Sequence, residues 1–391
     1  MTHQHRSFPL SEGVRGVTAL AIVVVHIFMG TDGFQDQLTH RLVYRLDVCV
    51  AMFFALSAFL LYRPMIAHRA GGPAGPSVGD FARRRFFRIY PTYWFALVCL
   101  AIYPGLNGVF SDSWWKFFTL ASNWSTQYTS QECYGSTDLC GLPQTWTLAT
   151  EMTFYVALPA LAAAGAWLYR RGGSRAELVW LGGLGLASLL SHALAPQMRG
   201  NPWYDNTLLA HFDWLAVGLV LAVLSVALEG RDRLPQPLDW LSRHPGQCYL
   251  LALGIYLVMV VTLPPVPFRF EPDTSTYVLE HVAHTVLAFV LLVPVAFGNP
   301  NQGLVRRALG HPVLIWFGLI SYGIYLWHFS VAYELLFNDP TASFGIVLFL
   351  TLAISVPLAA FSWYVIEKPL MRFKYGSSWR RAHAARDEQR L

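Results

Sequence analysis

Long apolar stretches separated by short polar segments run through the whole chain. Ten of them reach or approach the roughly 20 residues that cross the hydrocarbon core of a bilayer. Because a spanning segment must satisfy its own backbone hydrogen bonds, each is expected to be helical. The pattern therefore predicts an all-α fold, a polytopic membrane bundle of ten transmembrane helices. The ten spans are residues 12–30, 44–62, 91–108, 147–168, 177–194, 209–228, 247–263, 277–297, 312–332 and 344–365.

Composition supports a membrane protein with little folded mass outside the bilayer. Of the 391 residues, 54% are hydrophobic and only 13% are charged, whereas soluble domains carry about 25% charged residues. The first 12 residues lack a small-residue cleavage site, so we expect the first span to be retained. We predict one transmembrane domain over residues 1–375, followed by a polar tail at 376–391, in the inner (cytoplasmic) membrane as a multi-pass protein.

The distribution of basic residues predicts the orientation of the spans. Cytoplasmic loops of membrane proteins are enriched in Lys and Arg. With ten spans and the N-terminus inside, most of the 28 Lys and Arg residues fall on the cytoplasmic side. Both termini are therefore predicted to be cytoplasmic, and the net charge of +5 needs no nucleic-acid partner to explain it. The basic residues left outside are Arg41, Arg45, Lys116, Arg199 and Arg269.

The five cysteines divide into two groups. Cys49, Cys99 and Cys248 stand singly in or beside apolar spans and are expected to be packing residues. Cys133 and Cys140 lie in a polar loop predicted to be outside, where disulfides persist. We favour a disulfide between them, with two free thiols as the alternative, because spacing alone does not fix connectivity.

The first span carries two polar groups on one face. Arg15 and His26 are eleven residues apart, which is about 16 Å of rise and nearly three whole turns. A charge at mid-membrane costs roughly 2.5–3.5 kcal/mol even on a lenient scale, so such groups need a function or a partner. A neutral His26 hydrogen-bonded to a neighbouring helix is the structural alternative.

Two later spans carry polar faces that could meet His26. Glu151 and Tyr155 share a face of the fourth span at i and i+4, and the structural alternative for Glu151 is an ion pair with a helix Arg. In the ninth span, Ser321, Tyr325 and His328 fall at i, i+4 and i+7. Interhelical hydrogen bonding is the alternative for this stripe.

Three further residues of these spans have simpler interpretations. Asp47 opens the second span, where it is either part of a site or an interfacial carboxylate. Tyr322 and Trp327 are predicted to face away from the polar stripe and to pack or to lie at the membrane interface.

Basic residues cluster just before the third span. Arg85 and Arg88 share a face at i and i+3. Topology and anionic headgroups explain most such clusters, but Arg is also suited to bidentate phosphate binding. The sequence contains no Walker loop, no GxSxG motif and no zinc-type Cys/His set, so no metal is predicted.

Taken together, these stretches resemble the bacterial acyltransferase family 3, whose members acylate sugars, lipids or antibiotics. The resemblance covers residues 12 to 372, and each motif is weak alone, whereas six in the same order are specific. In this sequence they read EGVRGVTALAIVVVHI, DVCVAMFFALSAFLLYRP, RRRFFRIYPTYW, QTWTLATEMTFYVALP, GLISYGIYLWHF and YVIEKPLMRF. Two positions depart from the family pattern. Ala58 replaces a common glycine, and Glu12 replaces a common aspartate.

The resemblance implies ten core helices and an acyl-CoA donor, usually acetyl-CoA, arriving from the cytoplasm. It implies that His26 is the catalytic histidine, that Arg15 and Glu151 are essential partners, and that Arg85 and Arg88 hold the donor. Some members carry an extra hydrolase-like domain, and none is expected here.

We accordingly predict an O-acyltransferase, an O-acetyltransferase by resemblance, with His26 as general base or acyl carrier. Glu151 is predicted to orient the imidazole. By their depth in the membrane, Asp47, Ser321, Tyr325 and His328 are predicted to line the acceptor side. The acceptor is a hydroxyl of a glycan, a glycolipid or other lipid, or a small antibiotic-type molecule. Two alternatives remain open: a transporter or flippase of a polar solute that uses the same His, Glu and Arg residues, and a passive scaffold in which these groups only join helices.

Overall fold

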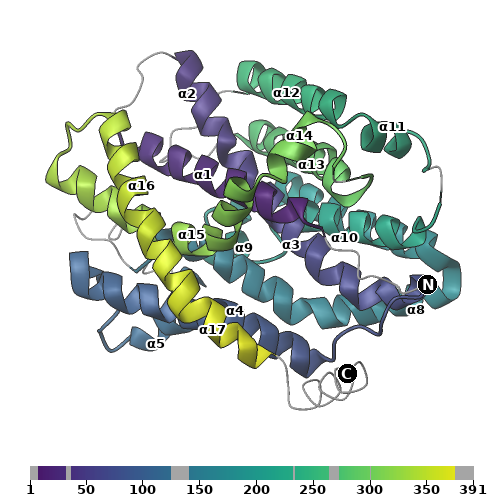
Figure 1. The fold of residues 1–391 in the computed structure, drawn as a ribbon, viewed down its shortest axis with the longest axis horizontal. Coiled ribbons are helices and arrows are strands. Elements are labelled where there is room, and N and C mark those ends of the chain that lie inside the picture. Colours follow the sequence, from purple (N-terminus) through teal and green to yellow (C-terminus); the bar gives the residue numbers. More distant parts are fainter. Residues whose placement is uncertain are drawn as a thin grey trace.

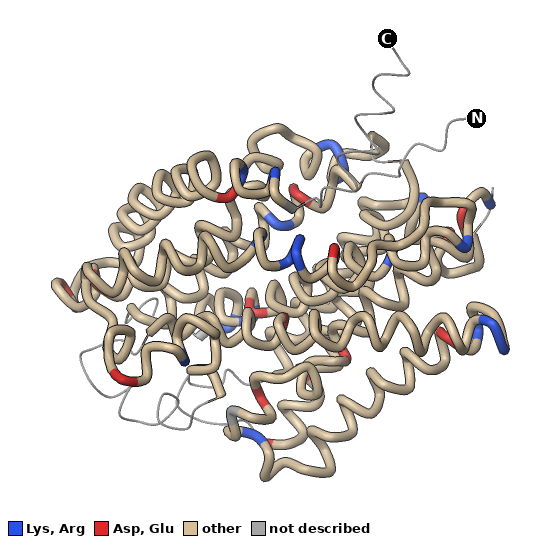
Figure 2. The backbone as a smooth tube through the Cα atoms, turned by 90° about the horizontal axis from the view of Figure 1, so that it is seen from below, with Lys and Arg blue, Asp and Glu red and all other residues tan. Residues whose placement is uncertain are grey.

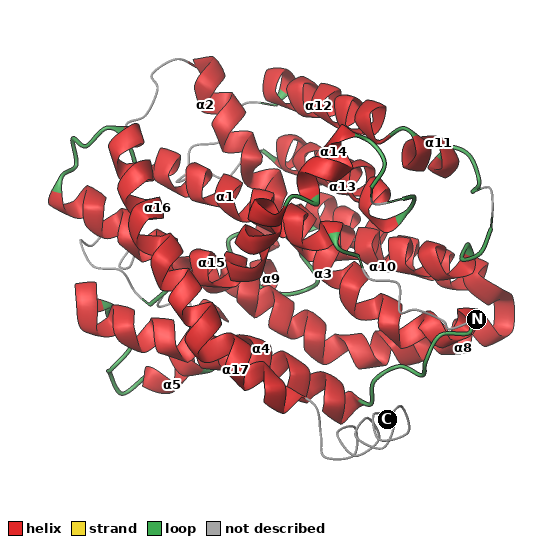
Figure 3. Cartoon of the chain, viewed as in Figure 1, coloured by secondary structure: helices red, strands yellow, loops and turns green. Residues whose placement is uncertain are grey.

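The computed structural model describes residues 8–31, 37–124, 141–231, 234–263, 273–299 and 301–374. Helices dominate this part of the chain, and no strand occurs in it (Figure 3). The α-helices are α1 (Leu10–Gly30), α2 (Gln37–Tyr44), α3 (Val48–Ile66), α4 (Val78–Leu100), α5 (Trp114–Phe118), α8 (Trp146–Leu194), α9 (Pro202–Asp205), α10 (Phe212–Ala227), α11 (Leu238–Arg243), α12 (Pro245–Thr262), α13 (Thr274–Ala296), α14 (Leu304–Leu309), α15 (Pro312–Asn338), α16 (Phe344–Phe361) and α17 (Lys368–Leu370).

Short helical turns extend several of these helices. The 3₁₀ turn η1 (Arg45–Asp47) joins α2 to α3, η5 (Pro143–Thr145) precedes α8, and the π-helical segment η7 (Ser362–Glu367) joins α16 to α17. The π-helical segment η3 (Ala101–Gly105) continues α4. The remaining 3₁₀ turns are η2 (Ala67–Ala70), η4 (Ala121–Trp124), η6 (Pro196–Met198) and η8 (Met371–Lys374).

All ten predicted apolar stretches are largely helical, which confirms the all-α membrane fold. Eight helices of the described chain are long and apolar enough to span a membrane, and α10 is a shorter apolar helix. Two predicted spans, 147–168 and 177–194, fall within α8, whose backbone breaks at Gly172 and Gly173. The number of crossings and the sides on which the termini lie stay predictions. Cys133, Cys140 and the tail 376–391 lie outside the described residues.

One helix begins well before the sequence pattern predicted. The third span was expected to begin at residue 91, but α4 begins at Val78. The hydroxyl oxygen of Ser77 accepts a hydrogen bond from the backbone N–H of Asp80 at 3.1 Å, which caps this helix end. Arg85 and Arg88 therefore lie within a regular helix and not at its entrance.

The bundle is arranged around α1, α3, α10 and α15 (Figure 1). The helix α1 packs along α15, which packs in turn against α16. The helix α3 packs along α10, and α10 also contacts α8 and α13. Segments far apart in the sequence thereby enclose one interior, into which α1, α3, α4, α8 and α15 all contribute side chains.

Glycines allow two of these helix pairs to approach until their backbones touch. A Cβ atom on Gly318 of α15 would lie 1.9 Å from the carbonyl oxygen of Glu12 in α1, and one on Gly16 would lie 2.5 Å from that of Leu314. A Cβ on Gly218 of α10 would lie 1.9 Å from the carbonyl oxygen of Ala55 in α3. Small residues at such contacts are the usual basis of close packing in membranes, where apolar burial alone does not hold helices together.

Charged residues are few along the chain, and several lie inside the bundle (Figure 2). The structure pairs them. Arg69 forms an ion pair with Glu177, which also accepts a hydrogen bond from Tyr62. The buried Arg306 donates to the carbonyl oxygens of Pro294, Ser242 and Phe297 at 2.7–2.9 Å. These partners offset the cost of burying charge in an apolar bundle.

The helix α13 begins at a capped end. The carboxylate of Asp273 accepts hydrogen bonds from the hydroxyls and backbone N–H groups of Ser275 and Thr276. Because these bonds favour the ionised form, they hold the pKa of Asp273 well below its usual value. The cap thus fixes the start of the helix that carries Glu280 and His284.

We expect Gly318→Val and Gly218→Val to destabilise the bundle. The new side chain collides with a backbone carbonyl that cannot rotate away, and overpacking of this kind costs about 1–3 kcal/mol or more. Thermal unfolding of the purified variants in detergent measures the change in melting temperature. Gly254→Val in α12 is the matched control, because a Cβ atom on Gly254 would have no other atom within 4 Å. Equal melting temperatures for all three variants would contradict this packing argument.

Candidate functional site

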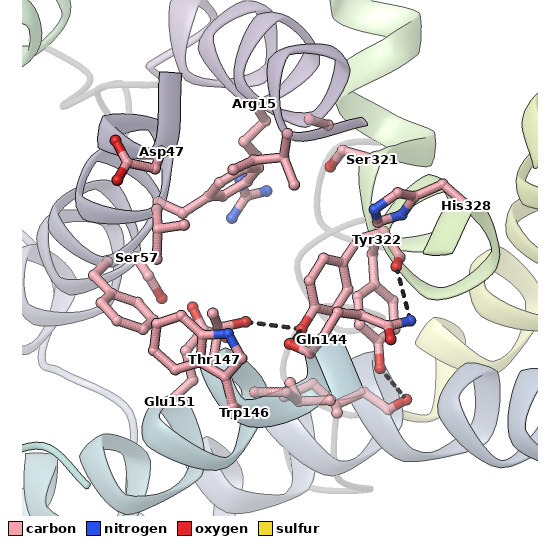
Figure 4. Close-up of a pocket in the computed structure, with 18 of the residues that line it drawn as sticks. Arg15, Asp47, Ser57, Gln144, Trp146, Thr147, Glu151, Ser321, Tyr322 and His328 are labelled. Carbon is pink, nitrogen blue, oxygen red and sulfur yellow. Dashed lines mark hydrogen bonds between the residues drawn. The ribbon is translucent and has the colours of Figure 1, made fainter. Parts of the chain in front are cut away.

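A cavity of about 570 Å³ lies in the centre of the bundle. All nine residues that the sequence predicted for the site, apart from the cysteines, line it. Figure 4 shows the labelled side chains around a common space, with Asp47 and Ser57 on one side and Ser321, Tyr322 and His328 on the other. The structure thus brings five helices together at one site. The nine residues are Arg15, His26, Asp47, Arg85, Arg88, Glu151, Ser321, Tyr325 and His328.

His26 is held by a second histidine. Its Nδ1 lies 2.8 Å from Nε2 of His328, and the two rings are nearly parallel, with 5° between their planes. The Nδ1 of His328 lies 2.9 Å from the carbonyl oxygen of Ile324. Because a carbonyl oxygen can only accept a hydrogen bond, this Nδ1 carries a proton. A neutral His328 therefore accepts at Nε2, and His26 donates from Nδ1.

This chain of hydrogen bonds assigns the tautomer of His26. With the proton on Nδ1, the lone pair of Nε2 is available, and this nitrogen has no hydrogen-bond partner in the part of the chain that the structure describes. In proteins, a hydrogen bond at one ring nitrogen of a histidine commonly sets the orientation of the ring and the basicity of the other nitrogen. The geometry therefore provides a nucleophilic or basic nitrogen at the cavity wall.

The predicted role of Glu151 as the group that orients His26 is wrong. Its Oε2 accepts a hydrogen bond from Tyr155 at 2.8 Å, one turn further along α8. Arg15 and Arg85 are the cations that act on this carboxylate. The position next to the His26 ring belongs to His328, because the close α1–α15 packing brings these two helices nearer to each other than either is to α8 at this level.

One end of the cavity is rich in arginine. This arginine end consists of Arg15, Arg85 and Arg88. Arg15 pairs with Glu12 at 3.2 Å, and Arg88 pairs with Glu367. Glu367 belongs to the motif YVIEKPLMRF, which begins at the end of the last predicted span, and no site role was predicted for it.

Arg85 differs from the other two arginines. No carboxylate of the described segments lies within ion-pair distance of its guanidinium, which lies 5.9 Å from the centre of the Tyr155 ring. Its Nε has no hydrogen-bond partner among the described residues. An arginine that faces a cavity with unused donors is a ready site for an anionic group, since its planar fork matches phosphate oxygens.

The polar face of α15 is tied to the start of α8. The Tyr325 hydroxyl donates to the carbonyl oxygen of Gln144 and lies 2.8 Å from the hydroxyl of Thr147. The amide nitrogen of Gln144 donates to the carbonyl oxygen of Leu326 at 3.2 Å. Ser321 donates to the carbonyl oxygen of Gly318 within α15. These bonds give Tyr325 and Ser321 fixed orientations at the cavity wall.

Tyr322 was predicted to face away from the polar stripe, and this prediction is wrong. It lines the cavity, and its hydroxyl donates to the carbonyl oxygen of Ile89 in α4 at 3.1 Å. Trp327 packs in the core and donates to Ser362, as predicted. The cavity is lined by more than one face of α15, and α4 contacts α15 at this side of the cavity.

Other residues at this site were missed by the sequence analysis. Asp47 of the cavity wall lies 3.4 Å from Nε2 of His284, and Arg45 pairs with Glu280 at 2.9 Å. Glu280 and His284 lie in a predicted span, so their ionisable side chains were the available signal. Arg45 was counted only among the basic residues outside the membrane or at outer helix ends, and the structure places it fully buried.

The tautomer assignment is testable by chemical modification. Diethyl pyrocarbonate acylates an unprotonated, accessible imidazole nitrogen, so His26 is expected to react rapidly. His192 is the control, because it is fully buried and both of its nitrogens are engaged, with Ala210 and Tyr204. Peptide mass spectrometry of the modified protein measures both rates. Equal protection of His26 and His192 would contradict an available Nε2.

Comparisons with known proteins agree with the resemblance seen in the sequence. The family model described as the acyltransferase domain matches residues 11–360. A Bacillus subtilis protein named provisionally as a peptidoglycan O-acetyltransferase is 24% identical over 97% of this chain. Nodulation protein 10 of Rhizobium leguminosarum bv. viciae is 26% identical over 86% of the chain. The peptidoglycan O-acetyltransferase OatA of Listeria monocytogenes is 24% identical over 84%.

The relatives differ in length from this chain. The match covers 57% of the Bacillus protein and 50% of the Listeria protein, but 85% of the Rhizobium protein. No solved structure matches the chain.

Proposed function

Since the chain belongs to the acyltransferase family 3, we propose that it transfers an acyl group from acyl-CoA to a hydroxyl of a glycan at the cavity described above. The acyl group is acetyl by analogy with the relatives that are named O-acetyltransferases. The glycan class rests on the names of two of them, which specify peptidoglycan. The protein is a multi-pass membrane protein, and its proposed location is the inner membrane.

The arginine end is the proposed site for the phosphates of CoA. Arg85 offers unused donors, and Arg15 and Arg88 add positive charge. A charge-assisted hydrogen bond to a phosphate contributes about 1.5–3 kcal/mol. Because Arg15 and His26 lie about 16 Å apart along α1, a flexible thioester arm bound by its phosphates can extend along the cavity to the imidazole.

His26 is the proposed reacting group. As a carrier, its Nε2 attacks the thioester carbonyl carbon, the carbon–sulfur bond breaks, and the thiolate of CoA leaves. The Nδ1 proton then moves to Nε2 of His328, so that the acylated ring becomes neutral. The acceptor oxygen then attacks the acyl carbon and its proton passes to a base or to water. The bond from the acyl carbon to Nε2 breaks, and His328 returns its extra proton to Nδ1 of His26, which restores both rings. As a general base, His26 Nε2 instead takes the proton of the acceptor hydroxyl while the hydroxyl oxygen attacks the thioester.

Mass spectrometry of the protein after incubation with acetyl-CoA alone distinguishes the carrier route from the general-base route, since only the carrier route leaves an acetyl group on His26.

The observation that carries the proposal is the shared cavity. An unprotonated imidazole nitrogen and an arginine with free donors open on the same space of about 570 Å³, a volume typical of small-ligand sites. This space suits an acyl-bearing thioester arm and a single hydroxyl-bearing unit. A polymeric glycan therefore presents one sugar at a time.

We expect His26→Ala to abolish acetyl transfer and Arg85→Ala to raise the KM for acetyl-CoA about 10- to 100-fold through loss of a phosphate contact. The measurement supplies labelled acetyl-CoA to membranes that contain the protein and follows CoA release and the molecule that gains the label. Arg83→Ala is the matched control, because Arg83 lies on the same helix, is exposed and donates to the carbonyl oxygen of Phe373.

Two results would overturn the proposal. One is unchanged CoA release by the His26→Ala protein, and the other is an equal effect of the Arg83 and Arg85 substitutions on the KM. A transporter that uses the same residues would not consume acetyl-CoA at all, so release of CoA also separates that alternative from the enzyme.

A further inference from the structure

A second group of ionisable residues lies at the wall of the same cavity. Asp47 lines the cavity from the turn η1, on the side away from Ser321 and His328 (Figure 4). Behind it lie Glu280 and His284, four residues apart and therefore on one face of α13. One oxygen or nitrogen atom from each of these three side chains lies within 4.8 Å of those of the other two. No role follows for Glu280 or His284 from the comparisons.

While His284 is unprotonated, the charges of this group do not cancel. Arg45, whose side chain is only 1% exposed, pairs with Glu280 at 2.9 Å and compensates one carboxylate. The carboxylate of Asp47 remains, with a neutral imidazole beside it. An uncompensated charge in an apolar bundle is costly. The group reaches neutrality by taking up one proton, which Asp47 and His284 can share.

A neighbouring pair shows what a purely structural arrangement looks like here. Asp213 accepts hydrogen bonds from His281 at 3.0 Å and from Thr285 at 3.1 Å, and both members of the ion pair are buried. By contrast, neither ring nitrogen of His284 has a hydrogen-bond partner among the described residues, although its side chain is only 3% exposed. The Asp47 side chain is 28% exposed, and the exposed part faces the cavity.

We propose that Asp47 and His284 form an acid–base pair for the acceptor hydroxyl, a role that rests on the proposed function. The step follows the carrier route: the acceptor oxygen forms a bond to the acyl carbon, and the bond from that carbon to Nε2 of His26 breaks. The hydroxyl proton moves to Asp47 and is shared with His284. The released thiolate takes a proton from water, and the pair later returns its own proton to water. Glu280 and Arg45 position the pair and do not touch the acceptor.

This assignment gives the acyl group and the hydroxyl separate proton-handling groups within one cavity. His26 and His328 serve the acyl group, whereas Asp47 and His284 serve the hydroxyl. A divalent cation is the other ligand that two carboxylates and an imidazole could hold. The charge count favours the proton, because a proton makes the group neutral while a divalent cation leaves a net positive charge beside Arg45.

The test compares two small alcohols as acceptors. Purified full-length protein in lipid nanodiscs is given acetyl-CoA with either ethanol or 2,2,2-trifluoroethanol, and ester formation and CoA release are measured. Asp47→Asn and His284→Gln are expected to lower kcat for ethanol about 100-fold, the usual contribution of a general base. Trifluoroethanol is more acidic than ethanol and depends less on a base, so in the same two variants kcat for trifluoroethanol is expected to fall less than about 10-fold. The KM for acetyl-CoA stays unchanged in both variants.

His281→Gln is the matched control, since it alters the structural histidine one turn away on α13. It is expected to affect both alcohols equally. The proposal would be overturned if the His284 variant slowed both alcohols equally, or if it transferred acetyl to ethanol at the wild-type rate. Binding of about one divalent metal ion per chain, lost in Asp47→Asn and measured by elemental analysis, would overturn it in favour of a cation site. Absence of CoA release from the wild-type protein would instead defeat the proposed function itself, and this proposal with it.

Discussion

The contact between the backbones of α1 and α15 is the constraint on which the candidate site depends. Gly16 and Gly318 let the two helices touch, and at this separation the His26 and His328 rings come within hydrogen-bond distance. A wider spacing would leave both imidazoles without this partner. The proton positions follow from it, because the Ile324 carbonyl fixes His328, and His328 fixes His26. Helix packing thus determines which nitrogen faces the cavity.

Several buried charged groups of this bundle are paired away from the cavity, as in Arg69 with Glu177 or Asp213 with His281. At the cavity wall, the Nε of Arg85 has no hydrogen-bond partner among the described residues, and behind Asp47 neither ring nitrogen of His284 has one. Because unpaired polar groups inside a membrane are costly, a wall that keeps several of them is built for a polar ligand. The unpaired groups therefore mark the cavity, rather than the paired charges elsewhere in the bundle, as the candidate functional site.

The order of groups along the cavity matches the proposed anionic donor and neutral acceptor. Positive charge concentrates at the arginine end, and the imidazole of His26 lies further along α1. Asp47 and the hydroxyl of Tyr325 add acidic and neutral polar groups to the wall. Family membership agrees with this arrangement, and two relatives are named as peptidoglycan O-acetyltransferases.

The sequence by itself determined that the protein is an all-α membrane bundle and which polar residues share a face within each of α1, α4, α8 and α15, because apolar length and helical periodicity are local properties. It did not determine that α4 begins at Val78, that Tyr322 faces the cavity, or that His328 rather than Glu151 holds His26. It also gave no reason to join Asp47 with His284. Such partners are decided by the distance and rotation of helices hundreds of residues apart, and only the packed tertiary structure sets these, since each helix alone permits several neighbours.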